Sequence, residues 1–157
     1  ILRRADHALL AEPAISIALR KTGSFPVKLI APDLYRSINL QEEWGRLYKI
    51  EAKIPQAGLA IIGDTNGKEE LISKVLAEYD KSLAWYKNNK EEASKLVVKT
   101  LPMLEEKGLA DSIEHVRFEN INAINSKKDL EFFFDILMQN DSKLIGGKLP
   151  NEDFYYK

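Results

Sequence analysis

Apolar residues in the first part of the chain form short runs between breakers. Three such runs are HALLA (7–11), PVKLIA (26–31) and QAGLAIIG (56–63). Runs of this length that are bounded by proline or glycine are typical of buried strands. We therefore predict strands over these three ranges, and a further extended segment at RFENINAI (117–124).

Two early segments carry a helical pattern instead. PAISIALRKTG (13–23) starts with a proline, which suits a first helical turn, and ends at a glycine that stops the helix. NLQEEWGRLY (39–48) predicts a short helix with Asn39 as its cap.

Helical spacing dominates the chain after residue 64. Two capping boxes, Asn66 with Glu69 and Asn89 with Glu92, predict the starts of two helices. Ser126 is predicted to cap a final helix. The tail 145–157 has no periodicity. The apolar positions of the first of these helices are Ile72, Val75, Leu76, Tyr79, Leu83 and Tyr86.

Short strands that alternate with helices predict an α/β fold with some parallel pairing. Three or four strands are few for a free-standing sheet that is covered on both faces. We therefore expect residues 1–157 to form a single α/β domain that is one part of a larger body. It would have a strand-rich part with a few-stranded sheet at 1–63 and a helix-rich part at 64–157.

Composition and charge exclude several functional classes. The chain has 157 residues, of which 23 are basic and 24 acidic. It therefore lacks the excess of positive charge that binding to nucleic acid or an anionic membrane favours. It has no cysteine, which excludes disulfides, thiolate nucleophiles and iron–sulfur clusters. The chain opens at Ile1 rather than Met and carries no signal segment, so we expect it to be a piece of a longer protein.

Motifs that carry chemistry are scarce. His7 and His115 are the only histidines and lack neighbours at metal-ligand spacing, so we interpret them as a strand residue and a surface helix residue. GDTNGKEE (63–70) has the wrong glycine spacing for a phosphate loop and is interpreted as a turn. The aromatic runs at 85–86 and 132–134 are interpreted as core. No cofactor, metal site or catalytic residue is therefore expected.

Glu12 and Pro13 form the first candidate ligand site. A carboxylate at the end of a predicted strand, just ahead of a helix, lies where open α/β sheets bind ligands. The positive end of the helix would favour its ionised form. An acid that merely starts the helix explains the same residues equally well.

Gln56, Ala57 and Gly58 form the second candidate site, at the start of the third predicted strand. A glutamine there can donate a hydrogen bond to a ligand, and a glycine permits close approach of the backbone. An ordinary strand entry is the alternative, and the sequence alone does not decide between them.

Four segments in order carry a resemblance to a known family. They are ADHALLAEPAISIAL (5–19), DLYRSINLQEEWG (33–45), IPQAGLAI (54–61) and IGGKLPNEDFYY (145–156). Together they resemble the later half of a bacterial ABC-transporter substrate-binding protein, in the group that binds sulfonates, taurine, nitrate and thiamine precursors. This resemblance implies a type II periplasmic-binding-protein fold, of which the chain would supply mainly one lobe.

The resemblance also implies a function. The parent protein would capture a small solute between its lobes and deliver it to a membrane ABC permease, without catalysis and without nucleic acid. Glu12 and Pro13 would line the cleft, with Gln56 to Gly58 at its edge. A ligand-facing Glu12 would favour a solute with a cationic or donor group, unless the carboxylate is salt-bridged within the protein.

The implied location is periplasmic, or extracellular and membrane-anchored as a lipoprotein. Exposed apolar surface and sheet edges on the isolated chain would favour self-association. Two other functions remain open on the same fold: an enzyme of the thiamine-pyrimidine or menaquinone-pathway type, and a sensor domain of a signalling protein.

Overall fold

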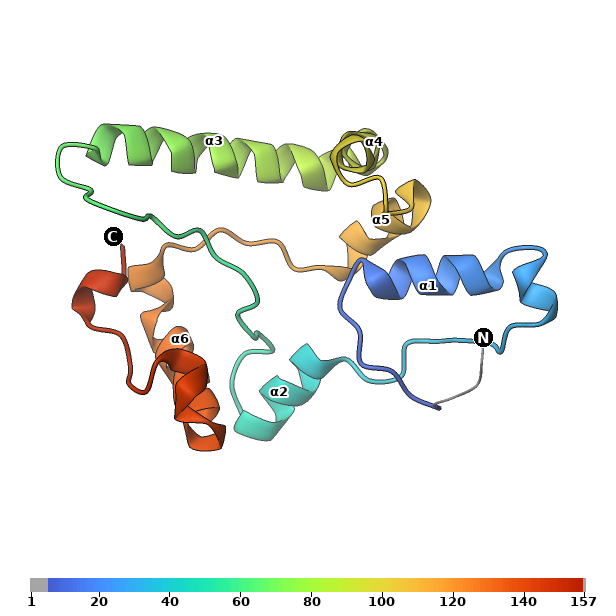
Figure 1. Ribbon diagram of the computed structural model, residues 1–157, viewed down its shortest axis with the longest axis horizontal. Coiled ribbons are helices and arrows are strands. Elements are labelled where there is room, and N and C mark those ends of the chain that lie inside the picture. The colour runs from blue at the N-terminus through green and yellow to red at the C-terminus, as the bar shows by residue number, and fades with distance from the viewer. Residues whose placement is uncertain (1–5, 157) are drawn as a thin grey trace. The chain divides into compact units, whose positions relative to one another are not determined.

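The computed structural model describes residues 6–156, and they are helical (Figure 1). Ile1 and Ala5, which figure in the sequence analysis, lie outside that range. The α-helices are α1 (Ala14–Gly23), α2 (Leu40–Tyr48), α3 (Glu69–Asn88), α4 (Lys90–Thr100), α5 (Glu106–Ser112) and α6 (Ala123–Asn140). The short 3-10 helices are η1 (Val27–Leu29), η2 (Ile113–His115), η3 (Ser142–Ile145) and η4 (Glu152–Phe154).

The predicted α/β fold is wrong, because residues 6–156 contain no β-strand. Segments 7–11 and 56–62 lack helical structure but lie beside no pairing partner, and η1 occupies the middle of 26–31. The predicted extended segment 117–124 runs into α6 at Ala123. A strand exists only where a second backbone supplies its ladder of hydrogen bonds. Apolar runs alone therefore do not make a sheet.

The early helix predictions are confirmed. α1 and α2 fall within the predicted ranges 13–23 and 39–48. Asn39 caps α2 as expected, because its Oδ1 accepts a hydrogen bond from the Gln41 N–H at 3.0 Å.

Of the three later caps, Asn89 occupies the predicted cap position of α4 without a capping hydrogen bond from its side chain, and the predictions of Asn66 and Ser126 as caps are wrong. Lys68 precedes α3 and Asn89 precedes α4, and neither side chain caps its helix. α6 begins one turn earlier than predicted, where Asn122 accepts a hydrogen bond from the Asn125 N–H. Ser126 lies inside this helix and donates to the carbonyl of Asn122 at 3.2 Å. At α6 both Asn122 and Ser126 are residue types that cap helices, and the side chain of Asn122 makes the capping contact.

The chain divides into two compact units, each built from two stretches of sequence. Unit 1 comprises Ile1–Ser37 and Asn66–Phe118, and unit 2 comprises Ile38–Thr65 and Glu119–Lys157. The two units are described separately below.

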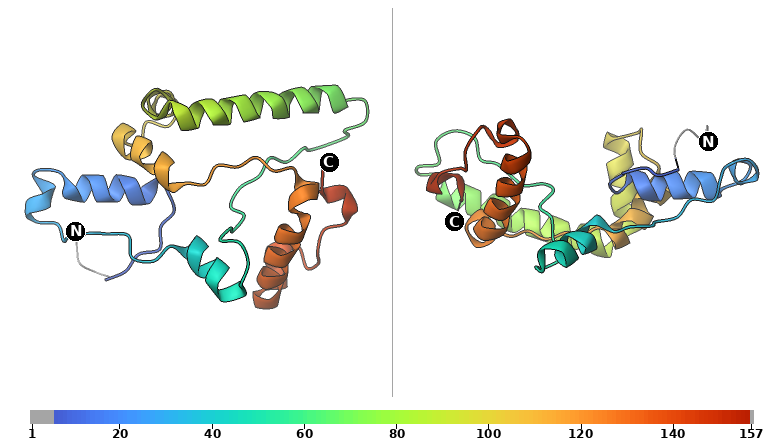
Figure 2. Two further views of the ribbon diagram at one scale, coloured as in Figure 1. Left: turned by 180° about the vertical axis from the view of Figure 1, so that it is seen from behind. Right: turned by 90° about the horizontal axis from the view of Figure 1, so that it is seen from below.

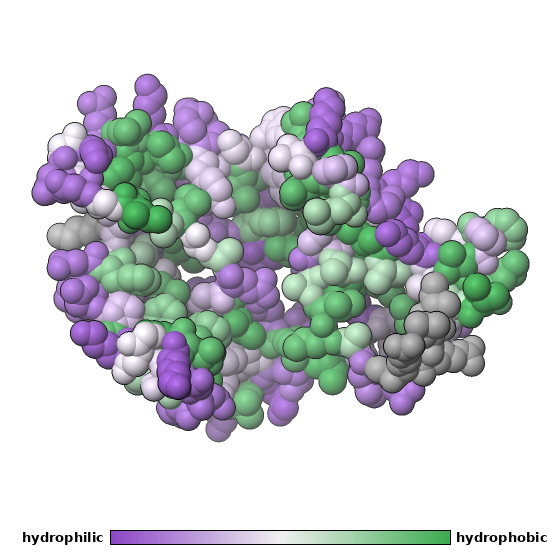
Figure 3. All heavy atoms as spheres, in the orientation of Figure 1, coloured by the Kyte–Doolittle hydropathy of each residue, from purple (hydrophilic) through white to green (hydrophobic). Residues whose placement is uncertain are grey.

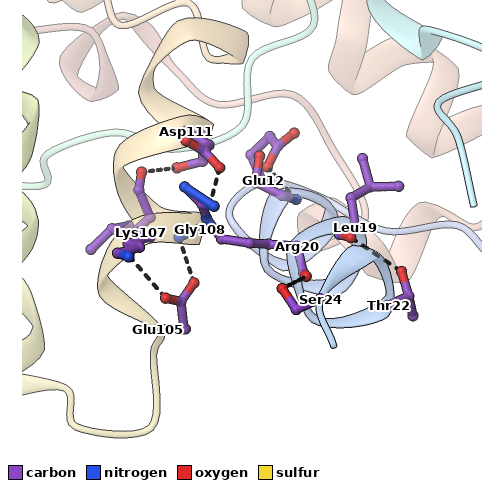
Figure 4. A network of polar contacts seen from close by, with 12 residues as sticks. Glu12, Leu19, Arg20, Thr22, Ser24, Glu105, Lys107, Gly108 and Asp111 are labelled. Atoms are coloured by element: carbon purple, nitrogen blue, oxygen red, sulfur yellow. Dashed lines mark hydrogen bonds and ion pairs between the residues drawn. The ribbon is translucent and has the colours of Figure 1, made fainter. Parts of the chain in front are cut away.

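In unit 1, α1 lies beside α5, and α5 lies beside α4 (Figure 2). Gly108 on α5 permits the first of these contacts, because a Cβ there would lie 2.8 Å from the Ile17 Cα. Arg20 of α1 pairs with Asp111 of α5, with Arg20 Nε 3.1 Å from Asp111 Oδ2. Figure 4 shows the two side chains pointing toward each other. Glu105 caps α5 by accepting hydrogen bonds from two backbone N–H groups. The buried apolar side chains of this unit are Ala93, Leu109 and Ile113.

Unit 2 is held together by aromatic rings. Trp44 of α2 meets Phe132 and Phe133 of α6 edge-on, with ring centroids 5.8 and 5.9 Å apart. Tyr155, near the end of the chain, is only 3% exposed. Its hydroxyl donates a hydrogen bond to Glu131 Oε1 at 3.3 Å, so the tail lies against α6.

Many large apolar side chains remain exposed in both units. Figure 3 shows apolar residues spread over the surface among polar ones. Leu9 is 80% exposed and Ile62 is 95% exposed, and α3 buries none of its side chains fully. Scattered apolar residues are normal on protein surfaces. Large contiguous apolar patches, in contrast, mark places where another molecule or chain segment binds.

Candidate functional site

Glu12 anchors a polar cluster at the start of α1. Its side chain is only 8% exposed, and its Oε1 accepts a hydrogen bond from Arg36 Nη2 at 2.6 Å. Its Oε2 accepts from the Ser16 N–H at 3.1 Å. Arg36 also donates to Ser16 Oγ at 2.8 Å. One guanidinium nitrogen therefore joins the extended segment after η1 to the first turn of α1.

The electrostatics of this cluster favour an ionised Glu12. Burial alone would raise the pKa of the carboxyl, but the hydrogen bonds from Arg36 and Ser16 outweigh it, and the pKa is lowered from 4.5. Arg36 is 36% exposed, so water screens part of the attraction between the two charges. The group is a charged carboxylate near neutral pH.

Pro13 lies directly before α1, and its carbonyl accepts the Ile17 N–H at 3.0 Å. The Glu12–Pro13 peptide bond is cis. The helix-start interpretation of Glu12 and Pro13 matches these contacts, since both residues satisfy backbone groups of the first turn. Because Glu12 is salt-bridged within the protein, the inference toward a cationic ligand loses its basis.

Gln56, Ala57 and Gly58 lie in the other unit, on an exposed segment without helical structure. A Cβ added at Gly58 would meet no atom within 4 Å, so no neighbouring backbone requires a glycine there. The structure therefore assigns the two candidate sets to different compact units. Gln56 keeps an exposed amide that can donate to a ligand.

The histidines form no site with other ligating groups. His7 is exposed on the segment before α1, outside any strand, and His115 is exposed in η2. Within residues 6–156, no group of three or more His, Cys, Asp and Glu side chains could hold a metal ion. In that same range, no helix is long and apolar enough to cross a membrane.

An open groove between α3 and α4 was missed by the sequence analysis. Its volume is about 480 Å³. Trp85 and Tyr86, interpreted as core, line it together with Leu96 and Val97. Burial raises the pKa of the Tyr86 hydroxyl, which keeps the phenol neutral. The signal in the sequence was this aromatic pair placed just before the Asn89 break and followed by a second apolar face.

The polar groups at the groove rim already have partners. Lys81 pairs with Glu78 at 2.7 Å, and Ser82 Oγ donates to the Glu78 carbonyl at 2.8 Å. A specific site for a polar solute needs several convergent polar groups, and the lining of this groove offers few. The groove therefore suits apolar contact rather than recognition of a charged molecule.

We compared the chain with protein-family models, curated proteins and solved structures. No protein-family model matches the chain, and neither a curated protein nor a solved structure matches it.

Proposed function

We propose that this chain is part of the solute-binding component of an ABC importer, which captures a small solute and delivers it to a membrane permease. The proposal is carried by the ordered set of four segments: 5–19, 33–45, 54–61 and 145–156. No single one of them is distinctive. Their order, and their distribution from residue 5 to residue 156, are what favour this function.

Two exposed segments support the idea that the chain works within a larger body. Segments 8–11 and 57–61 are apolar, lie at the surface and belong to two of the four sequence segments. Apolar surface of this kind is covered in a working protein by further chain or by a partner. A solute-binding protein that encloses its ligand between two bodies offers such a cover.

The polar groups assign different tasks to the two candidate sets. Glu12 holds Arg36 and the first turn of α1, so in this proposal its task is structural and lies within unit 1. Gln56 has the exposed amide, so it is the group proposed to contact the solute. The class of solute is a small polar molecule that a side-chain amide can recognise through hydrogen bonds.

The test is a thermal-shift screen of the full-length gene product that contains this chain. The panel comprises aminopyrimidines, sulfonates, amino acids, polyamines, nitrate and small sugars. A ligand at 100 times its dissociation constant adds about 2.7 kcal/mol of stability, which raises the melting temperature measurably. We expect one compound to stabilise the protein and to be recovered unchanged.

Substitution of the contacting residue sharpens this test. Gln56→Ala should weaken binding of the selected compound about tenfold, because one hydrogen bond to the solute is lost. Gln139→Ala is the matched control, since Gln139 is an exposed glutamine on α6 of the same unit. Conversion of the compound to a product would instead establish an enzyme. No response to any compound would contradict solute capture for these classes.

A further inference from the structure

Asn66 and Gly67 form an exposed turn just before α3. Both residues are exposed, and a Cβ added at Gly67 would meet no atom within 4 Å. Gly67 has a φ of 71°, in the left-handed region that glycine enters without steric cost. Its N–H donates a hydrogen bond to Glu69 Oε1 at 3.2 Å. The turn therefore presents a side-chain amide, the backbone nitrogen that follows it and a carboxylate together at the surface.

An asparagine that precedes a glycine is open to a reaction with its own backbone. The nitrogen of the next residue lies only a few bonds from the side-chain carbonyl carbon, so attack on that carbon closes a small ring without any second molecule. A side chain on the next residue hinders the attack, and glycine has none. Among the asparagines of this chain, only Asn66 is followed by glycine.

We propose that Asn66 is a site of spontaneous modification, at which the asparagine is converted through a succinimide to aspartate and isoaspartate. The Gly67 nitrogen forms a bond to the side-chain carbonyl carbon of Asn66 and gives its proton to the Glu69 carboxylate, which acts as general base. The bond from that carbon to the side-chain nitrogen breaks. The carboxylate passes the proton to this nitrogen, which leaves as ammonia.

Water completes the reaction by opening the ring, and no other reactant is required. Opening at the side-chain carbonyl restores the original backbone and leaves an aspartate. Opening at the main-chain carbonyl leaves the backbone running through the side chain, as isoaspartate. Either product adds one negative charge to the turn before α3. This inference goes beyond the proposed function and does not depend on it.

The other asparagines lack this combination of features. Asn39 accepts a hydrogen bond from the Gln41 N–H at 3.0 Å. The side-chain amides of Asn89 and Asn140 donate to backbone carbonyls at 2.9 and 2.8 Å. Each of these three asparagines is followed by a residue with a side chain. Modification should therefore be selective for Asn66.

The first experiment follows the modification in the full chain by mass spectrometry. The protein is incubated at mildly alkaline pH in water labelled with heavy oxygen, and samples are digested with pepsin in acid, which slows further ring closure. We expect the peptide that contains Asn66 to lose its amide nitrogen, to gain one labelled oxygen and to separate into aspartate and isoaspartate forms. Asn151 is the internal control: it is exposed but precedes Glu152, so it should stay unmodified over the same time.

Three variants test the assigned atoms. Asn66→Gln should abolish the modification, because the longer side chain has to close a larger ring. Glu69→Gln should slow it several-fold, because an amide is a much weaker base than a carboxylate. Glu70→Gln is the matched control. It makes the same change of charge in the first turn of α3 and should leave the rate unchanged.

Three results would overturn the proposal. Aspartate without isoaspartate would exclude the ring, because isoaspartate forms only when the ring opens. Modification of Asn151 as fast as that of Asn66 would remove the selectivity of the turn. An equal rate in Glu69→Gln and the parent chain would overturn the role of Glu69 as base. None of these results changes the outcome of the solute screen, so the two proposals fail independently.

Discussion

Arg36 Nη2 lies 2.6 Å from Glu12 Oε1, although 24 residues separate the two in sequence. The same nitrogen lies 2.8 Å from Ser16 Oγ. This contact closes a loop that contains α1 and η1 and holds the extended segment near Arg36 against the first turn of α1. The contact therefore fastens the exposed segment around Arg36 to the rest of unit 1.

Glu12→Gln should therefore destabilise unit 1. The amide cannot form the ion pair, and Arg36 would keep a weakened neutral partner. We expect a loss of about 1–2 kcal/mol, below the value for a fully buried pair because Arg36 is partly exposed. Hydrogen exchange of the α1 amides measures this loss. Glu43→Gln, which breaks the exposed pair of Glu43 with Arg46 in α2, should change the exchange of α1 very little.

Acid should weaken the same unit. The pKa of Glu12 in the folded chain is lowered from 4.5, so its contribution is fully present above about pH 4.5. The contribution is lost as the pH falls through the lower folded value. Protection of the α1 amides should decline in that window. In Glu12→Gln the decline should be shallower, and an equally steep decline would show that other carboxyls control it.

Gly108→Ala should separate α1 from α5. A Cβ at this position would lie 2.8 Å from the Ile17 Cα, and both atoms belong to packed helices. Overpacking of this kind costs about 1–3 kcal/mol. Chemical denaturation of the chain measures the cost. Gly23→Ala, at the end of α1 with no atom within 4 Å of its Cβ, should leave stability within about 0.5 kcal/mol of the parent chain.

Tyr155→Ala should release the C-terminal tail from α6. The ring is nearly buried, lies beside Phe154 and has Lys127 Nζ 5.2 Å from its centroid. The Ile124 N–H donates to the Tyr156 carbonyl at 3.2 Å. We expect the Ile124 amide to lose its protection from hydrogen exchange, because the tail no longer holds that carbonyl in place.

Tyr155→Phe separates the ring from the hydroxyl in this experiment. It keeps the packing and removes only the bond to Glu131, so the Ile124 amide should stay largely protected. Phe25→Ala is the control for loss of an aromatic ring in general. Phe25 is 82% exposed in unit 1, and its removal should not affect Ile124. Full loss of protection in Tyr155→Phe would mean that the hydroxyl, and not the ring, secures the tail.

Local signals in the sequence predicted the helices and failed at most of the caps. α1, α2 and α3 follow from apolar spacing, and the Asn39 cap follows from its position before that pattern. The start of α6 at Asn122 did not follow, because Ser126 offered an equally good local signal one turn later. The choice between them depends on which backbone N–H each side chain reaches in the folded chain.

The candidate site divides in the same way. Glu12 and Pro13 were recognisable as a helix start, and the structure adds Arg36, which no spacing rule connects to them. Gln56 to Gly58 were recognisable as a break in an apolar run, but the sheet that would have positioned them does not form in the described residues. The aromatic groove between α3 and α4 depends on the change of direction between the two helices, which Figure 1 shows.

The sequence by itself determined where α1, α2, α3 and α4 lie, because the spacing of apolar residues and the breakers act over a few neighbouring positions. Only the tertiary structure decided whether apolar runs 7–11 and 56–62 pair as strands and which charges meet across long distances in sequence. Strand pairing and ion pairs join residues that local sequence does not bring together. Each needs a partner backbone or a partner side chain, and residues 56–62 have no such backbone partner within residues 6–156.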